Sequence, residues 1–206
     1  NKQVKPLVEH LIESHEKLNL SITESDGGAK IIDAGIKTTG CLEAGRIITE
    51  ICMGGLGTVS LSMTNNTPNW PLSIHVHSTD PVLSCLGSQY AGWSLSFVQN
   101  DDNFSALGSG PCRALAGKEE IFEDIGYEDK FFSTVVVLEV DQNPPQEIID
   151  KIVDDCGISE KNLTVILTPT RSLCGTTQVV GRVLEVGLHK VHELGFPIDK
   201  VVDGFG

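Results

Sequence analysis

The chain of 206 residues is poor in basic side chains, with 15 lysines and arginines against 28 aspartates and glutamates. The resulting net charge of −13 argues against nonspecific binding of nucleic acid, which requires clustered positive charge to neutralise phosphates. No apolar run approaches the roughly 20 residues that a membrane-spanning helix needs. The polar start, Asn1-Lys2-Gln3, is also unlike a secretory signal peptide. These absences predict a cytoplasmic protein that binds neither nucleic acid nor membrane.

Paired cysteines are missing as well. Six cysteines are spread singly along the chain, without a C-x-x-C pair or a nearby C-x-x-H arrangement, so a zinc or iron–sulfur site is not expected. A chain of this length, 40% hydrophobic, can bury a substantial core without disulfide bonds. We therefore expect reduced thiols that are mostly buried.

Hydrophobic periodicity predicts a mixed α/β fold. After residue 134 the order strand, helix, strand, helix predicts parallel strands joined by right-handed crossovers. The acidic stretch 118–130 predicts a boundary between a first α/β region, 1–117, and a second, 118–206. A polar turn is expected at 65–69. The expected helices are 6–20, 43–53, 81–89, 145–156 and 172–194, and the expected strands are 29–36, 58–63, 73–79, 93–98, 134–140 and 163–167.

The run from Gly108 to Arg113 is the most informative local motif. Glycines followed by Pro111 predict a flexible loop that leads directly into a helix. Free N–H groups at such a helix start favour a phosphate or carboxylate, and Arg113 can add a charge-assisted hydrogen bond. By spacing alone, a surface turn before an ordinary helix explains these residues equally well.

The helix expected at 172–194 has one apolar side and one polar side. Arg182 and Glu185 lie one turn apart on the polar side and can therefore meet on the helix surface. A solvated helix face is the usual explanation of such a stripe, and we retain it for the two histidines. The polar stripe consists of Gln178, Arg182, Glu185, His189 and His192.

Several segments, in the same order along nearly the whole chain, resemble the methenyltetrahydromethanopterin cyclohydrolases of archaeal one-carbon metabolism and methanogenesis. Family members continue beyond the point where this chain stops, so the resemblance implies the N-terminal portion of a two-domain subunit, with part of the second domain absent. It also implies assembly as a homotrimer. The segments that carry the resemblance are Glu43-Ala44-Gly45, 51–59, Ala91-Gly92-Trp93, 107–116 and 178–190.

The resemblance implies that Glu185 and Arg182 are the working pair of a hydrolase that opens a methenyl bridge between two nitrogens. Glu185 would take a proton from water and pass it to the departing nitrogen, and Arg182 would position it. Burial would have to oppose Arg182 to raise the pKa of Glu185 toward neutrality. The pterin substrate supplies the electrophile, so neither a metal nor an organic cofactor is required. The residues expected to bind the anionic part of the substrate are Gly108, Ser109, Gly110 and Arg113.

Two other functions fit parts of the sequence. A thiol hydrolase would use Cys112 or Cys174 as nucleophile and His75 or His77 as base, with the helix start lowering the pKa of Cys112. A phospholigand-binding module would use 108–113 without turnover.

Replacing Cys112 by Ala separates the cyclohydrolase from the thiol enzyme. We expect the full-length protein carrying Cys112→Ala to keep its rate of methenyl hydrolysis, measured by loss of substrate absorbance, because that reaction requires no thiolate. Loss of activity in a folded variant would favour the thiol enzyme.

Overall fold

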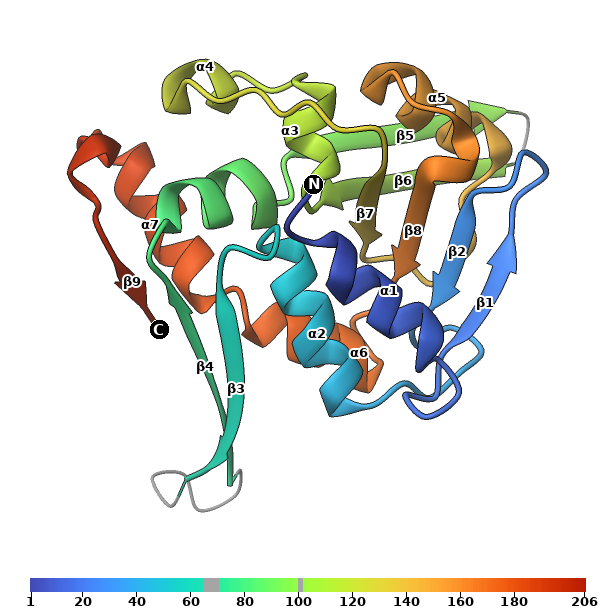
Figure 1. Ribbon diagram of the computed structural model, residues 1–206, viewed down its shortest axis with the longest axis horizontal. Coiled ribbons are helices and arrows are strands. Elements are labelled where there is room, and N and C mark those ends of the chain that lie inside the picture. The colour runs from blue at the N-terminus through green and yellow to red at the C-terminus, as the bar shows by residue number, and fades with distance from the viewer. Residues whose placement is uncertain (65–70, 100–101) are drawn as a thin grey trace.

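A computed structural model describes residues 1–64, 71–99 and 102–206 (Figure 1). The turn expected at 65–69 lies outside the described residues. The strands are β1 Ser21–Glu24, β2 Lys30–Asp33, β3 Thr58–Met63, β4 Leu72–Ser78, β5 Trp93–Gln99, β6 Asp102–Ser109, β7 Thr134–Leu138, β8 Leu163–Leu167 and β9 Gly204–Phe205. The α-helices are α1 Lys5–Glu13, α2 Leu42–Cys52, α3 Cys112–Ala116, α4 Ile121–Ile125, α5 Gln146–Cys156, α6 Leu173–Val180 and α7 Val183–Glu193. A π-helix, η1 Val82–Gln89, and two short 3₁₀ helices, η2 Glu160–Asn162 and η3 Ile198–Lys200, complete the described elements.

The central sheet has six strands in the order β1-β2-β8-β7-β6-β5. Strands β2, β8 and β7 run parallel, and the remaining neighbours are antiparallel. The predicted mixed α/β class and the predicted parallel pairing of the two strands after residue 134 are therefore confirmed. The parallel strands are almost continuously apolar because helices cover both of their faces.

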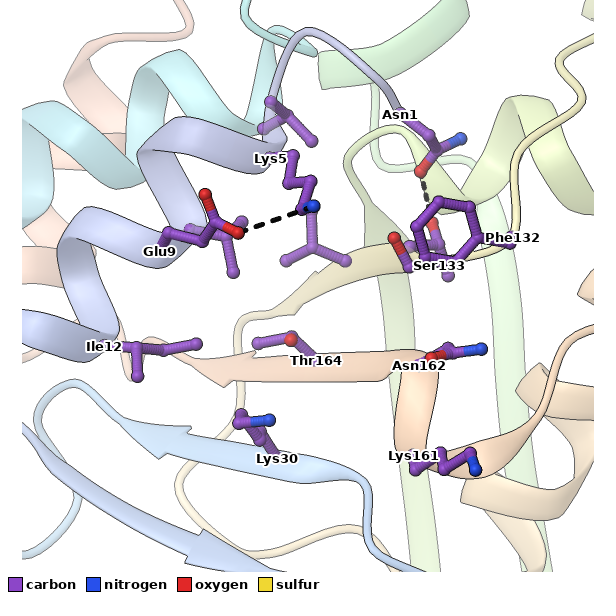
Figure 2. Close-up of a pocket in the computed structure, with 14 residues that line it drawn as sticks. Asn1, Lys5, Glu9, Ile12, Lys30, Phe132, Ser133, Lys161, Asn162 and Thr164 are labelled. Atoms are coloured by element: carbon purple, nitrogen blue, oxygen red, sulfur yellow. Dashed lines mark hydrogen bonds and ion pairs between the residues drawn. The ribbon is translucent and has the colours of Figure 1, made fainter.

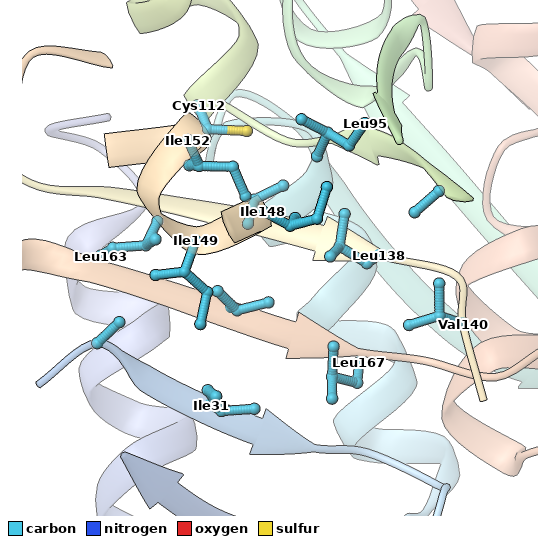
Figure 3. Close-up of a cluster of buried hydrophobic side chains, with 14 of the residues drawn as sticks. Ile31, Leu95, Cys112, Leu138, Val140, Ile148, Ile149, Ile152, Leu163 and Leu167 are labelled. Carbon is cyan, nitrogen blue, oxygen red and sulfur yellow. The ribbon is translucent and has the colours of Figure 1, made fainter. Parts of the chain in front are cut away.

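Alternate residues of β7 enter two different cores. Val136 and Leu138 join a cluster beneath α5 and α3, whereas Val135 and Val137 face α1 and α2. Figure 3 shows the first cluster, where Ile148, Ile149 and Ile152 of α5 lie against the sheet. This division follows from the two-residue period of a strand, which sends successive side chains to opposite faces.

A second sheet has the order β3-β4-β9, and its β3–β4 hairpin projects from the body of the molecule (Figure 1). Helix α7 packs between this sheet and η1, with Leu188 against Cys85 and Leu86. Both sheets combine strands from 1–117 with strands from 118–206. The proposed division near residue 117 stays a prediction, and it does not separate one sheet from the other.

The structure corrects several element boundaries. The first helix is Lys5–Glu13, and the strand expected at 29–36 is Lys30–Asp33. Strand β6 was not among the expected strands: it covers 102–109, with Phe104 and Ala106 buried at alternate positions, and it includes the start of the run expected to be a flexible loop. The long helix expected at 172–194 is two helices, interrupted at Gly181 and Arg182.

All six cysteines are free and five of them are buried, which confirms the expectation of reduced, mostly buried thiols. Among the described residues, no helix is both long enough and apolar enough to cross a bilayer.

The core beneath α5 provides a test of the fold. Leu138 is fully buried, so Leu138→Ala is expected to lower the free energy of unfolding by about 2–5 kcal/mol, because it removes buried methyl groups and leaves a cavity. The matched control is Leu194→Ala, since Leu194 is 72% exposed and its loss should change stability by less than about 0.5 kcal/mol. Urea unfolding followed by circular dichroism measures both. Equal stabilities of the two variants would contradict the assigned core.

Candidate active site

The predicted pair, Arg182 and Glu185, lies at the interruption between α6 and α7. Gly181 lies where a Cβ atom would come within 2.5 Å of Cγ2 of Thr49 on α2, so a side chain at this position would force the helices apart. The Gly181 carbonyl accepts a hydrogen bond from Nε2 of Gln89, at 3.1 Å. Arg182 follows as the residue before α7, and Glu185 stands in the first turn of that helix.

Arg182 and Glu185 meet, as predicted, but inside the protein rather than on an exposed helix face. Nη1 of Arg182 lies 3.5 Å from Oε2 of Glu185, and their side chains are only 12% and 6% exposed. Burial raises the pKa of Glu185 above its ordinary value, although the Arg182 guanidinium acts in the opposite direction. The predicted role of Glu185 requires burial to raise its pKa by more than the ion pair with Arg182 lowers it.

Arg182 is held in place by groups from three elements. Its Nη1 donates to the carbonyl of Gln89 at the end of η1, at 2.6 Å, and its Nη2 donates to Oγ of Ser109 at the end of β6, at 2.9 Å. Its Nε donates to Oε1 of Gln178 on α6, at 3.2 Å. The Ser109 hydroxyl in turn donates to the Gln89 carbonyl, at 2.7 Å, which closes a small hydrogen-bonded ring around the guanidinium.

Arg113 has a different environment from the one expected of an exposed anion ligand. It is fully buried, and Glu119 accepts two hydrogen bonds from its guanidinium, each at 2.7 Å. Its Nη1 donates to the carbonyls of Leu86 and Ser88 in η1, at 2.9 and 3.2 Å. Arg113 therefore fixes the last turn of the π-helix, directly before the Gln89 carbonyl that holds Arg182. Its predicted contact with substrate stays a prediction.

Gly108, Ser109 and Gly110 do not form the expected flexible loop. Gly108 and Ser109 end strand β6, where they pair with Leu138 and Val137 of β7. Gly110 has a φ of +101°, which favours glycine, and its N–H donates to the Ser88 carbonyl at 2.9 Å. Of these three residues, Ser109 is the one that contacts the Arg182 site through its side chain.

A cleft of about 300 Å³ opens beside Arg182, between α6 and the β6–β7 part of the central sheet. Gln178 and Ser109 line it together with Arg182. Nε2 of Gln178 and Oε1 of Gln89 are buried and have no hydrogen-bond partner among the described residues. Buried polar atoms are normally satisfied, so the unpartnered donor of Gln178 indicates that a ligand or water belongs beside it.

The two glutamines were missed as site residues. Gln178 appeared in the polar stripe, but its partner Gln89 lies in a segment whose pattern indicated only a short helix. Gly181 within a helical pattern was the available signal, because an isolated glycine there often marks a break or close packing. His189 and His192 stay outside the cleft: His189 stacks on Tyr90, and His192 lies 3.3 Å from Asp124.

The structure argues against a thiol hydrolase, because burial disfavours the thiolate form of both candidate nucleophiles. Cys112 is fully buried, and burial raises its pKa well above the ordinary value, contrary to the lowered pKa expected at a helix start. Burial also raises the pKa of Cys174 to about 11. His75 and His77 lie on β4 of the second sheet, where they contact Ser62 and Asp203. Neither Cys112 nor Cys174 is therefore expected to be a thiolate at neutral pH.

Another hollow lies between α1 and the amino ends of β7 and β8, and Figure 2 shows Lys5, Lys30 and Lys161 around it. Lys5 pairs with Glu9 at 3.6 Å. None of the predicted site residues lines this hollow, which lies at the opposite end of β8 from Arg171. Across the three described segments, no group of three His, Cys, Asp or Glu side chains is arranged to hold a metal ion.

The family model described as "Cyclohydrolase (MCH)" matches residues 1–206. The chain belongs to this cyclohydrolase family. Its membership confirms the resemblance inferred from the sequence motifs.

Relatives within the cyclohydrolase family carry the name methenyltetrahydromethanopterin cyclohydrolase. A protein of Methylobacillus flagellatus is 57% identical over 99% of this chain and 61% of its own length. A protein of Methylobacterium organophilum is 49% identical over 98% of this chain and 62% of its own length. One of Methanospirillum hungatei JF-1 is 42% identical over 100% and 64%. The chain therefore spans about three fifths of the length of the curated relatives that it matches.

The ion pair that anchors η1 in this cyclohydrolase chain can be tested by Glu119→Gln. The substitution leaves the buried Arg113 guanidinium without its carboxylate, so we expect the free energy of unfolding to fall by about 3 kcal/mol, measured in urea. Glu120→Gln is the matched control, because this exposed neighbour makes no side-chain hydrogen bond or ion pair with the described residues. If both variants were equally stable, the pair would not be the anchor described here.

Proposed function

We propose that this chain carries the catalytic pair of a methenyltetrahydromethanopterin cyclohydrolase, which reversibly hydrolyses 5,10-methenyltetrahydromethanopterin to the 5-formyl compound. The observation that carries the proposal is the buried Glu185 carboxyl, whose pKa is raised, beside Arg182 at the break between α6 and α7. Family membership and the names of the relatives support the substrate assignment.

The chemistry begins with an amidinium-like carbon that already carries positive charge. The Glu185 carboxylate orients a water molecule and accepts its proton as the water oxygen bonds to that carbon. The bond from the carbon to one nitrogen then breaks, and Glu185 returns a proton to the departing nitrogen. The remaining hydroxyl proton is lost as the formyl C=O forms on the other nitrogen, so one water is consumed and one proton is released.

The neighbours of Glu185 suit this cycle. Burial raises the pKa of the Glu185 carboxyl above its ordinary value and Arg182 opposes that shift, which favours a carboxyl that both accepts and returns a proton during the cycle. The guanidinium is also directed by its hydrogen bonds to Gln89, Ser109 and Gln178, which limits its motion. The free N–H of Gln178 is a candidate donor to the developing formyl oxygen.

The substrate supplies the electrophile, so the proposed reaction needs no metal and no organic cofactor. We also propose that the whole protein is a cytoplasmic homotrimer with its pterin cleft between two domains. The archaeal and methanogenic setting stays a prediction, because the most similar relatives named above are bacterial.

Glu185→Gln tests the proposed base. The amide has a similar shape but does not accept the water proton, so kcat should fall by roughly 10²-fold to 10⁴-fold. Loss of methenyl absorbance on full-length protein measures the rate, and circular dichroism checks folding. Glu193→Gln on the same helix, an exposed substitution, is the matched control and should leave kcat unchanged. Equal rates for wild type and Glu185→Gln would remove Glu185 from the mechanism, and an inactive wild type would overturn the assigned reaction.

The pH profile provides a further check on Glu185. Hydrolysis requires the carboxylate, so the wild-type rate should fall as the pH drops through its raised pKa, and Glu185→Gln should lack this step. A raised pKa favours the folded protein at low pH, and this contribution is lost as the pH rises through the folded-state value. The titration of Glu185 therefore does not unfold the protein on the acid side. A wild-type profile without an acid limb would contradict the assignment.

A further inference from the structure

The cleft beside Arg182 adjoins a second hollow. The two share Ser105 of β6 and Glu139, the residue after β7, and the second has a volume of about 360 Å³. It is formed largely by residues that follow the carboxyl ends of β7 and β8, which lie at the same edge of the central sheet (Figure 1). Ligands of open α/β sheets bind at this edge. The two adjoining hollows are together called the groove here; Arg182 lines the first of them, and Arg171 lines the second, at the end of β8.

Arg171 differs from the other arginines of the chain. The chain has four arginines, and three of them, Arg46, Arg113 and Arg182, each lie within 4 Å of a glutamate carboxylate. Arg171 is exposed, and its guanidinium makes no hydrogen bond or ion pair with any described residue. In a chain with 28 acidic side chains, a guanidinium left unpaired at the end of a groove is available to an external anion.

The groove between the two arginines is polar. Thr170 donates a hydrogen bond to Glu139, and Asp141 and Gln142 also line the second hollow. Carboxylate and amide oxygens accept hydrogen bonds from hydroxyl groups, whereas they repel an anion. The second hollow therefore offers acceptors for the hydroxyl groups of a bound chain, and Arg171 is the one side chain among its lining residues that offers a positive charge to an anion.

Helix α6 fixes the distance between the two ends. Ser172, next to Arg171, caps this helix by accepting a hydrogen bond from the Gly175 N–H at 2.9 Å, and Gln178 lies in its last turn. At about 1.5 Å per residue, the eight residues of α6 span roughly 12 Å. Helix α6 therefore separates the backbone of Arg171 from that of Arg182 by a length on the order of 12 Å.

We propose that Arg171 binds an anionic group, phosphate or carboxylate, on a hydroxyl-bearing extension of the substrate whose reacting end lies at Arg182 and Glu185. This inference rests on the proposed cyclohydrolase function. It assigns the anion to Arg171 rather than to Arg113, whose guanidinium is occupied by Glu119 and by η1 carbonyls.

The test compares two substrates on the full-length protein: the intact methenyl pterin and an analogue truncated before its first anionic group. Arg171→Ala should raise KM for the intact substrate by about tenfold or more, as expected for loss of a charged hydrogen bond, with kcat unchanged. KM for the truncated substrate should not change. Arg171→Lys should recover part of the loss. Raising the salt concentration should weaken intact-substrate binding less in Arg171→Ala than in wild type.

Lys161→Ala is the matched control, because it removes the same charge at the opposite end of β8 and should leave both KM values unchanged. An equal KM increase for both substrates in Arg171→Ala would overturn the proposal, since the effect would then not depend on the anion. An unchanged KM for the intact substrate would also overturn it. If wild type hydrolysed neither substrate, the cyclohydrolase function and this inference would both fail; activity without the KM difference would remove the inference alone.

Discussion

The carbonyl oxygen of Gln89 is the point on which the candidate site depends. It accepts hydrogen bonds from both the Arg182 guanidinium and the Ser109 hydroxyl, and thereby joins η1, β6 and the start of α7. Within the preceding three residues, the carbonyls of Leu86 and Ser88 accept hydrogen bonds from Arg113, whose charge Glu119 neutralises. A buried arginine is costly unless every donor is directed at an acceptor. Two such arginines, Arg113 from α3 and Arg182 before α7, donate to backbone carbonyls of the short helix η1 and thereby restrict the positions that its backbone can adopt.

The same arrangement explains why the pKa of Glu185 is raised although an arginine lies beside it. The guanidinium of its neighbour Arg182 donates hydrogen bonds to four acceptors, and Glu185 is one of them. Its stabilisation of the Glu185 carboxylate is therefore limited. Burial therefore has the larger effect on the carboxyl. The separation of 3.5 Å between Nη1 of Arg182 and Oε2 of Glu185 is long for a charged hydrogen bond, which is consistent with a weak pair.

The sequence predicted the central strands well because parallel strands buried on both faces leave an unmistakable apolar run, as in Thr134–Leu138 and Leu163–Leu167. The pairing of Arg182 with Glu185 was accessible for a similar reason, since three residues make one helical turn. The burial of Arg113 was not predicted, because its acceptors, Glu119 and two η1 carbonyls, come together only through the fold. Strand β6 was missed because glycine and serine are typical of loops, and its pairing with β5 decided otherwise.

Because η1 is a π-helix, the geometry of the site depends on the number of residues in this helix. Its N–H groups bond five residues back, as Tyr90 does to the Cys85 carbonyl at 2.7 Å, rather than four as in an α-helix. Removing one residue between Pro81 and Tyr90 would permit ordinary α-helical bonding and rotate every later carbonyl to a new direction. What positions the guanidinium of Arg182 is thus the number of residues in this segment. A side-chain substitution at Gln89 would leave that backbone acceptor in place, whereas a single deletion nearby would move it.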